Sequence, residues 1–292
     1  MIIINIWWLY FGDGDELDVL NLDLHLHTTA SDGKYSSQEV LNKAVAAGLQ
    51  IISITDHDTI KGYEELKDVA VGKVILIPGT EVTTYYEGLE IHILAYFPNG
   101  ISNTIRSLLS NLQDERVSRM KLCLFNLRKR GMRIGYQDVA QFANGSSISR
   151  SHIARALVAQ GYAANIYEAF TKFLSQDAGL IPPPSLSPLK LFDMLIKERA
   201  LSIWAHPELS DFDKHFATFK EKGLSGVEIC SKNKLSLYFE KTALSNRLLV
   251  TFGSDWHGFN DEETMGVKIN KERIKPFLDL FQLGSLPENP TS

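Results

Sequence analysis

The chain has 292 residues, of which 44% are hydrophobic and 22% charged, and its formal net charge is −5. This composition is that of an ordinary globular protein and excludes a general binder of polyanions, while the length suits a single α/β barrel. The two cysteines, Cys123 and Cys230, fit neither a disulfide framework nor a CxxC zinc motif, which favours a reducing, cytoplasmic compartment.

The first stretch, residues 1–12, is apolar and rich in aromatic side chains. It is too short to span a bilayer, and it lacks the basic start and the small-residue cleavage site of a signal peptide. We therefore expect residues 1–20 to form an N-terminal extension, either an extra strand or a loosely packed segment, to which the sequence assigns no role.

The first predicted strand, Leu20–His27, carries two histidines that are two residues apart. Residues at this spacing point to the same face of a strand, so His25 and His27 are expected to aim at one point. The loop-forming residues 28–33 follow, which places the pair at the carboxyl end of a strand, where α/β barrels build their sites. Two hydrogen-bonded core histidines remain an alternative, because this motif alone does not decide between them.

Strands and helices then alternate up to residue 97. A capping box, Ser36 with Glu39, predicts the start of a helix, and Gly48 predicts its end. The further predicted elements are a strand at Leu49–Thr55 that ends in Asp56-His57-Asp58, a helix at about 60–71, a strand at Val74–Ile77 followed by Gly79-Thr80-Glu81, and a strand at Leu89–Phe97 that contains His92. This alternation predicts a parallel α/β architecture.

No good strand is predicted between residue 102 and about residue 173, where apolar residues recur at helical spacing. Residues 101–155 hold ten Lys and Arg against three Asp and Glu, a net charge of +7 that leaves −12 for the rest of the chain. Much of this charge suits a solvated helix face, yet a basic block beside an acidic one also suits a phosphate-bearing substrate. The proline-rich segment 181–184 predicts a stiff linker after this helical insertion.

The α/β alternation resumes after the linker. The predicted elements are a helix at Leu189–Lys197, a strand at Leu201–Ala205 followed by His206, a helix at about 212–222, a strand at Gly226–Ile229, a helix at about 235–246, a strand at Leu248–Phe252 followed by Asp255 and His257, and an amphipathic tail at Lys271–Leu280. The expected division is a first barrel part (21–100), a helical insertion (101–185) and a second barrel part (186–285).

Six of the eight histidines lie in or at the ends of predicted core strands; these are His25, His27, His57, His92, His206 and His257. His152 lies in the insertion, and His215 is expected on an exposed helix face. Asp32, Glu81 and Asp255 add carboxylates in comparable positions. Such a set would be costly to bury unpaired, and a cluster of divalent cations is the simplest compensation. Imidazole and carboxylate ligands favour Zn, Mn or Fe as the metal. The alternative to a metal site is a set of structural histidines.

The motifs DLHLHTTASDG, ITDHDT, PGTEV, EIHILAY, WAHP and GSDWHG follow one another along the chain. In this order they resemble the motifs of the polymerase-and-histidinol-phosphatase (PHP) superfamily, over about residues 21–270. The inserted stretch ISRSHIARALVAQGY is similar to the helical insertion of the branch that contains 3′,5′-nucleotide bisphosphate phosphatases and the exoribonuclease RNase AM. Ser151 departs from that branch, which usually has proline in its Arg-Pro-His motif, and the N-terminal extension departs from it as well.

The resemblance implies a distorted (β/α)7 PHP barrel with an inserted all-helical subdomain and a site for three divalent metal ions. Carried over motif by motif, the ligands would be His25, His27, Glu81 and Asp255 for one metal, Asp32, His57 and His257 for a second, and Glu81, His92 and His206 for a third, with Glu81 bridging.

The resemblance also implies that Arg150 and His152 bind phosphate. A guanidinium binds phosphate oxygens bidentately, so Arg-x-His on a basic helical segment is a sensible clamp, although an ordinary surface arginine remains the alternative for Arg150. For Asp56 and Asp58 the alternative to a site role is loop hydrogen bonding, which we favour for Asp58.

The implied activity is a metal-dependent phosphoesterase that uses metal-activated hydroxide on nucleotides or short RNA ends, with no separate side-chain base. The chain contains neither GxxxxGK[ST] nor GxSxG, so NTP-driven chemistry and a serine hydrolase have no support. A histidinol-phosphate-type phosphatase is disfavoured by the basic insertion, and a noncatalytic metal-stabilised module would not need nine ligands. We expect a nucleotide or short RNA as substrate, no membrane association and no obligate protein partner.

Overall fold

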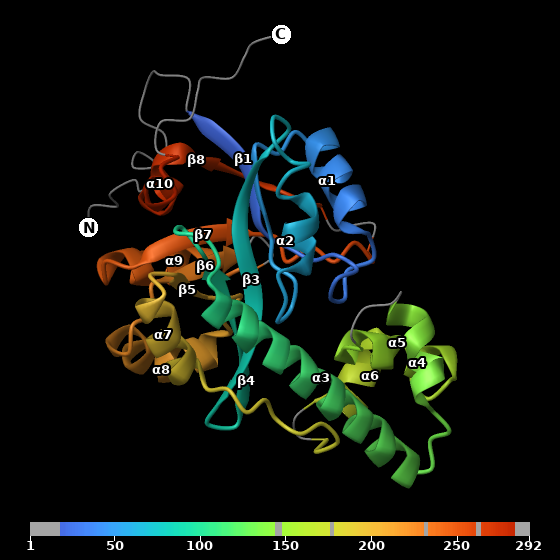
Figure 1. Ribbon diagram of the computed structural model, residues 1–292. Coiled ribbons are helices and arrows are strands. Elements are labelled where there is room, and N and C mark those ends of the chain that lie inside the picture. The colour runs from blue at the N-terminus through green and yellow to red at the C-terminus, as the bar shows by residue number, and fades with distance from the viewer. Residues whose placement is uncertain (1–17, 144–147, 176–177, 231–232, 261–263, 284–292) are drawn as a thin grey trace, which may run out of the picture.

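The computed structural model describes residues 18–143, 148–175, 178–230, 233–260 and 264–283 (Figure 1). Nearly all of the predicted N-terminal extension lies outside these residues. Within them, the strands form one mixed sheet in the order β7-β6-β5-β4-β3-β2-β1-β8. The sheet curves into a nearly closed barrel, because β7 returns to lie against β1. A Cβ on Gly253 in β7 would come within 2.5 Å of the Cβ of His25 in β1, so this approach requires glycine.

The barrel contains all seven strands that the sequence predicts, together with an eighth. The strands are β1 (Val19–Leu26), β2 (Ile51–Ile54), β3 (Ile75–Tyr86), β4 (Leu89–Tyr96), β5 (Leu201–Trp204), β6 (Gly226–Cys230), β7 (Leu249–Gly253) and β8 (Val267–Asn270). The unpredicted β8 pairs antiparallel with β1 along the outer edge of the sheet.

The prediction of an all-parallel sheet is wrong at β4, which runs antiparallel to both β3 and β5. The cause is a two-residue turn at Glu87 and Gly88, whose φ angles of 47° and 92° are those of a tight hairpin. Strand β3 also continues to Tyr86 instead of ending at Ile77. Glu81 therefore lies inside a long strand and not in the loop after it.

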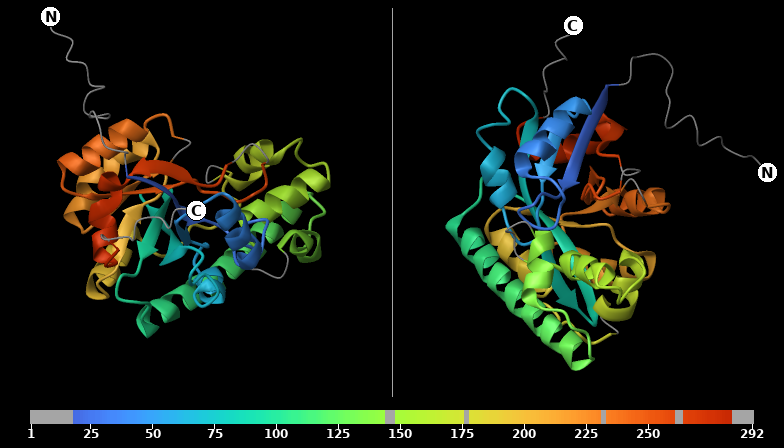
Figure 2. Two further views of the ribbon diagram at one scale, coloured as in Figure 1. Left: turned by 90° about the horizontal axis from the view of Figure 1, so that it is seen from above. Right: turned by 90° about the vertical axis from the view of Figure 1, so that its right-hand side faces the viewer.

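Helices cover the outside of the barrel (Figures 1 and 2). They are α1 (Ser37–Ala46), α2 (Lys61–Leu66), α7 (Pro188–Lys197), α8 (Leu209–Glu221), α9 (Ser236–Ser245) and α10 (Lys271–Leu280). The capping box of α1 is confirmed, since Ser36 and Glu39 bond reciprocally. Helix α2 is shorter than predicted, because the chain turns after Leu66.

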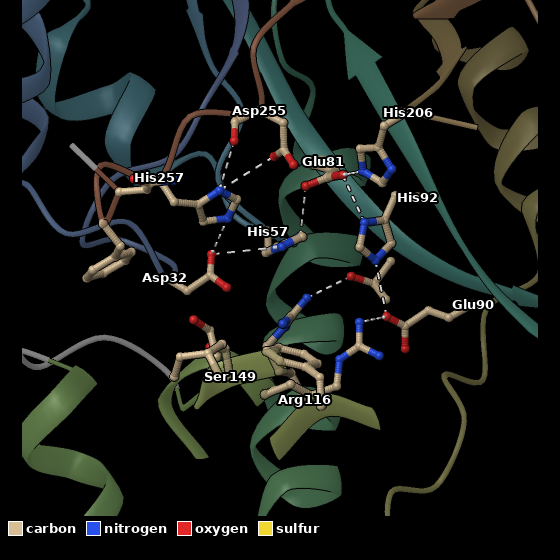
Figure 3. A pocket seen from close by; sticks show the side chains of 17 residues that line it. Asp32, His57, Glu81, Glu90, His92, Arg116, Ser149, His206, Asp255 and His257 are labelled. Atoms are coloured by element: carbon tan, nitrogen blue, oxygen red, sulfur yellow. Dashed lines mark hydrogen bonds and ion pairs between the residues drawn. The ribbon is translucent and has the colours of Figure 1, made fainter. Parts of the chain in front are cut away.

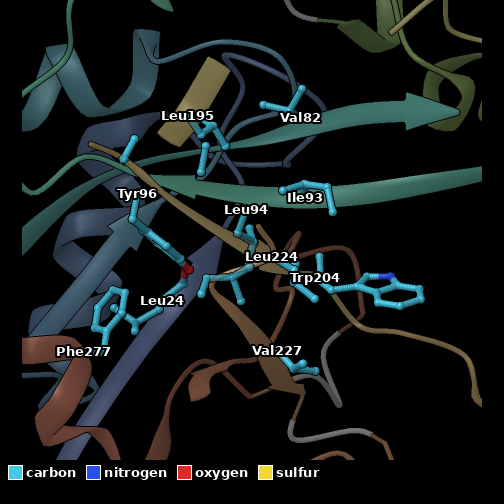
Figure 4. Close-up of a cluster of buried hydrophobic side chains, with 14 of the residues drawn as sticks. Leu24, Val82, Ile93, Leu94, Tyr96, Leu195, Trp204, Leu224, Val227 and Phe277 are labelled. Carbon is cyan, nitrogen blue, oxygen red and sulfur yellow. The ribbon is translucent and has the colours of Figure 1, made fainter. Parts of the chain in front are cut away.

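Buried aliphatic and aromatic side chains form one large cluster, which fills the barrel interior and continues between the strands and the helices that cover them (Figure 4). Tyr96 of β4 crosses this interior, and its hydroxyl donates a hydrogen bond to the carbonyl of Leu24 in β1 at 2.7 Å. The ring meets Phe277 of α10 edge to face. Because Tyr96 is fully buried, this hydrogen bond satisfies the one polar atom that the ring brings into the core.

The insertion is all helical in its described residues, as predicted. It consists of α3 (Asn103–Lys129), α4 (Tyr136–Ala143), α5 (Arg150–Ala159), α6 (Ile166–Ala169) and a π-helical turn (Phe170–Leu174). The first half of α3 packs Ile105, Leu109 and Leu112 into the barrel core. Its second half packs into a separate cluster with α4, α5 and α6, which Figure 1 shows grouped at the far end of α3. The domain limits named above stay a prediction.

The expectation that His215 is exposed is wrong, because only 2% of this residue is accessible. Its ring lies 5.2 Å from that of Tyr86 and 5.7 Å from that of Phe219, measured between ring centroids. The reason is the unpredicted length of β3, which carries Tyr86 over helix α8.

Candidate metal centre

The six predicted histidines and three predicted carboxylates lie together at one end of the barrel (Figure 3). Most come from the carboxyl ends of parallel strands: His25 and His27 with β1, Asp32 in the loop that follows, His57 after β2, His206 after β5, and Asp255 and His257 after β7. Glu81 and His92 come from the β3–β4 hairpin. Six strands thus bring together residues that are up to 232 positions apart in the sequence, from His25 to His257.

Glu81 is the centre of this cluster and has no accessible surface. Its two carboxylate oxygens face different groups of imidazoles. Oε2 lies 3.3 Å from His25 Nε2, 3.3 Å from His27 Nε2 and 3.0 Å from His57 Nδ1, whereas Oε1 lies 2.9 Å from His92 Nδ1 and 3.0 Å from His206 Nε2. A carboxylate placed between two sets of nitrogen atoms has the position of a bridging ligand.

Four donor atoms converge around a first point: His25 Nε2, His27 Nε2, Glu81 Oε2 and Asp255 Oδ1. The separation is 3.1 Å between the two nitrogen atoms and 3.3 to 3.4 Å between each nitrogen and each oxygen. Ligands held at about 2.0–2.2 Å from a tetrahedral ion are themselves about 3.3–3.6 Å apart. The spacing therefore matches a four-coordinate divalent ion.

Asp32 marks a second point, where its Oδ1 lies 3.4 Å from His257 Nε2 and 3.8 Å from His57 Nε2. His57 stands between this point and the hairpin, because its Nδ1 faces Glu81. Its ligand atoms can be grouped either with Asp32 and His257 or with Glu81 and His92. His57 can therefore contribute a ring nitrogen to either group of ligand atoms.

Several buried atoms of the cluster lack a hydrogen-bond partner. Among the described residues, these unpartnered atoms include Asp32 Oδ1, His57 Nδ1, Glu81 Oε2 and His92 Nδ1. Burying polar atoms without partners is costly, and native proteins do so rarely. Because these atoms lie near carboxylates and imidazoles of the cluster without the angles of hydrogen bonds, more than one cation bound among them would satisfy all four. The donor set therefore fits divalent metal ions.

The cluster also attracts positive charge. Burial opposes the charged form of each imidazole, but the neighbouring carboxylates of Asp255 and Glu81 raise the pKa of His27 to about 10. The charge of Glu81 likewise outweighs burial and raises the pKa of His92 to about 9. The carboxylates that raise these two pKa values make the surroundings of His27 and His92 electronegative, and metal ions would compete with protons for the same nitrogen atoms.

A second ring of contacts orients the imidazoles. The pairs are His25 Nδ1 with Glu228 Oε1 at 2.8 Å, His92 Nε2 with Glu90 Oε1 at 3.1 Å, His257 Nδ1 with the Asp255 carbonyl at 3.1 Å, and His27 Nδ1 with Ser31 Oγ at 3.4 Å. In each case one ring nitrogen is held by the protein and the other turns toward the cluster. This is the arrangement that fixes the orientation and tautomer of metal-binding histidines.

Glu228 and Glu90 contact histidines of the cluster, and the sequence analysis missed both. Glu228 is a buried acid within the apolar strand β6, and that contrast was a usable signal. Its second oxygen accepts a hydrogen bond from the backbone N–H of His206 at 2.8 Å, so it supports two residues of the cluster at once. Glu90 lies two residues before His92, on the same face of β4.

The loop aspartates have the structural role that was favoured for Asp58. Asp58 accepts hydrogen bonds from the Thr83 backbone N–H at 2.8 Å and from the Arg116 guanidinium at 2.6 and 3.0 Å. Asp56 accepts from the backbone and hydroxyl of Thr28 and from Ser31 Oγ. Through Ser31, Asp56 therefore also supports His27.

A pocket of about 550 Å³ lies over the cluster, and the insertion forms part of its wall. The wall residues outside the cluster include Ser149, Arg150, Ser151, Ile166, Phe170, Phe259 and Asn260. Arg150 contacts Glu90, and Arg119 reaches the other oxygen of Glu90 at 3.2 Å. The pocket therefore combines a floor of imidazoles and carboxylates with arginine on its wall.

His152 is 2% accessible and belongs to the first turn of α5. Its Nδ1 accepts a hydrogen bond from the Ser149 backbone N–H at 3.1 Å, which leaves the proton on Nε2. Burial lowers the pKa of His152 to about 4, so the ring is neutral at pH 7. Phosphate binding by His152 stays a prediction, and it would rest on one N–H donor and not on charge.

Comparison with known proteins adds family relationships. The PHP domain model matches residues 23–179. A 5′-3′ exoribonuclease, Rnm, of Salmonella typhimurium is 28% identical to this chain, and the match covers 80% of this chain and 84% of the relative. A 3′,5′-nucleoside bisphosphate phosphatase of Chromobacterium violaceum is 25% identical, and the match covers 81% of this chain and 87% of the relative. A crystal structure of a protein from Bifidobacterium adolescentis, described as a metal-dependent phosphoesterase, has a TM-score of 0.77 and 28% identity, covering 89% of this chain and 96% of that one.

The barrel fold, the cluster of histidines and carboxylates, and the relatives together identify this protein as a metal-dependent hydrolase that acts on phosphate esters. The family match spans more than half of the sequence, and the chain belongs to the PHP domain family. Among the described residues, the helices include none with the length and apolar character needed to cross a membrane.

Proposed function

We propose that this phosphoesterase acts on the ends of nucleotides, as a 3′,5′-bisphosphonucleotide phosphatase, a 5′-to-3′ exoribonuclease on short RNA ends, or both. The observation that carries the proposal is the shared pocket, which has the ligand cluster on one side and Arg150 of the basic insertion on the other. The names of the exoribonuclease and bisphosphate phosphatase relatives support the same substrate class.

The proposed cofactors are three divalent ions, Mn, Zn or Fe, because the donors are imidazole nitrogens and carboxylate oxygens. The proposed ligand sets are those named from the sequence, with Glu81 shared between the first and third ions. When bound, such ions activate water for attack on phosphorus and stabilise charge on the phosphoryl oxygens.

The remaining steps belong to the side chains of the protein. Glu228, Glu90 and Ser31 hold the histidines in one orientation, so that little reorganisation is needed when substrate arrives. Arg150 contacts Glu90 through Nη2, and a guanidinium carries five N–H donors, so the same side chain can also donate to a phosphate. Glu90 would thereby position Arg150 against the substrate and His92 against the metal.

The test is phosphate release from a 3′,5′-bisphosphonucleotide, histidinol phosphate and a short 5′-phosphorylated RNA, each with and without manganese. We expect turnover of the nucleotide or the RNA that depends on the metal. Preference for histidinol phosphate would favour the alternative phosphatase. Metal binding without release from any of the three would favour the noncatalytic module.

A cytoplasmic location and the absence of an obligate partner are also part of the proposal. The location is supported by Cys123 and Cys230, which are both buried and form no disulfide with each other. Fractionation of the cells that produce the protein, with size-exclusion chromatography of the purified chain, would test both statements.

A further inference from the structure

The pocket is lined by large apolar side chains as well as by the charged groups of the metal centre. Phe259, Ile166 and Phe170 are among its lining residues, and they come from the loop after β7, from α6 and from the π-helical turn. Phe259 and Ile166 each leave 41% of their surface accessible. Large apolar side chains that gather in a pocket with charged groups are typical of a ligand site, because their exposure costs free energy in the empty protein.

The ring of Phe259 is held in place from one side. The guanidinium carbon of Arg155 lies 3.2 Å from the centre of this ring, in a stacked cation–π contact. Arg155 is fixed in turn by a hydrogen bond to Ser151 Oγ at 3.1 Å. Phe259 lines the pocket and keeps 41% of its surface accessible, so the face of the ring that Arg155 does not cover stays available to a ligand. The ring therefore presents a preorganised surface to the pocket.

Phe170 is positioned by an uncommon piece of backbone. It begins the π-helical turn Phe170–Leu174, and such turns are rare and often mark functional sites. Phe170 also packs against the core of the insertion, so its ring has a rigid backing. The loop that carries Phe259 is the same loop that carries Asp255 and His257, which ties Phe259 to the metal centre.

We propose that Phe259, together with Phe170 and Ile166, forms a platform on which the base of the terminal nucleotide stacks while its phosphate lies at the metal centre. This inference rests on the proposed function and names the part of the substrate that the insertion recognises. A nucleotide has one charged end and one flat apolar face, and the pocket offers a matching surface for each. Stacking on an aromatic ring depends little on base identity, so the enzyme should require a base without strongly selecting one.

The test compares two substrates that differ only in the base. One is 2′-deoxyadenosine 3′,5′-bisphosphate, and the other is the same deoxyribose bisphosphate with hydrogen in place of the base. The measured quantity is the ratio of their kcat/KM values, for wild type and for Phe259→Ala. Loss of one base-stacking contact should lower this ratio about tenfold, mainly through KM of the nucleotide. Phe259→Tyr should restore most of the ratio, since it keeps the ring.

The matched control is Phe125→Ala. Phe125 is 51% exposed and also stacks with a cation, Lys129, but it lies on α3 and outside the pocket. It should leave the ratio unchanged. If Phe259→Ala leaves the ratio at its wild-type value, or if Phe125→Ala lowers it equally, the platform is refuted even though the enzyme hydrolyses nucleotides.

A binding measurement separates this inference from the proposed function. The fluorescence of a 2-aminopurine nucleotide should be quenched by stacking on wild-type protein and much less on Phe259→Ala. Quenching in a protein that releases no phosphate would support the platform and contradict the proposed function. Equal quenching by both proteins would contradict the platform.

Discussion

Glu228 provides a sharp test of how the metal centre is held. Its carboxylate is 1% accessible, bonds to His25 Nδ1 at 2.8 Å and accepts the His206 backbone N–H at 2.8 Å. The φ angle of His206 is 28°, a conformation that is unfavourable for a residue other than glycine and needs support from its surroundings. One buried carboxylate thus orients the side chain of His25 and the backbone of His206, which both belong to the cluster.

The substitution Glu228→Gln keeps the shape of this side chain and removes its charge. The amide has one oxygen, so it can accept from only one of the two partners and turns an NH₂ group toward the other. Losing a hydrogen bond to a charged group costs about 1.5–3 kcal/mol, which corresponds to a factor of roughly ten to a hundred. Outer partners of metal-binding histidines typically matter to this extent. We expect metal affinity and kcat/KM each to fall by that factor.

The assay is metal titration into chelated protein, followed by phosphate release under the same conditions. Glu240→Gln is the matched control, because Glu240 is also buried and pairs with Arg273 at 2.6 and 2.8 Å, between α9 and α10 and outside the pocket. It should lower the melting temperature without changing metal affinity. Wild-type affinity in Glu228→Gln, or an equal loss in Glu240→Gln, would refute the role assigned to Glu228.

Three further predictions follow from the site and the insertion. His257→Ala should abolish turnover while the melting temperature stays near wild type, and near-normal turnover with added manganese would show that His257 is not a ligand. Arg150→Ala should lower kcat/KM at least about tenfold on a 3′,5′-bisphosphonucleotide but much less on p-nitrophenyl phosphate. The control Arg106→Ala removes an ion-paired arginine outside the pocket and should change neither value. Equal losses on both substrates in Arg150→Ala would place Arg150 at the reaction centre. Burial raises the pKa of the Cys123 thiol to about 12, so iodoacetamide at pH 8 should label it only after unfolding, and rapid labelling of the native protein would contradict the buried core of the insertion.

Most of the fold could be predicted from local patterns in the sequence. The seven predicted strands, the capping box at Ser36 and the helical insertion all depend on residues close together in the chain. Strand β8 escaped prediction because Val267–Asn270 is short and only Ile269 of its residues is buried. The direction of β4 depended on the turn at Glu87 and Gly88, whose backbone conformation was not recognised.

The candidate site shows a similar division. Motifs located the nine cluster residues, because each lies in or just after a strand or in a recognisable loop. The importance of Glu228 depends on β6 lying near His25, 203 positions away in the sequence, which no local pattern reveals. His215 was misjudged for the same reason, since Tyr86 covers it only in the folded barrel. The sequence also could not show that His57 presents one ring nitrogen to Asp32 and the other to Glu81.

The central claim is that the cluster holds divalent metal ions on which phosphoester hydrolysis depends. The most direct measurement is elemental analysis of protein purified without chelator, combined with phosphate release before chelation, after chelation and after manganese is restored. The account predicts more than one transition metal ion per chain, loss of turnover on chelation and recovery with manganese. A metal-free protein that hydrolyses phosphoesters at its full rate would contradict it.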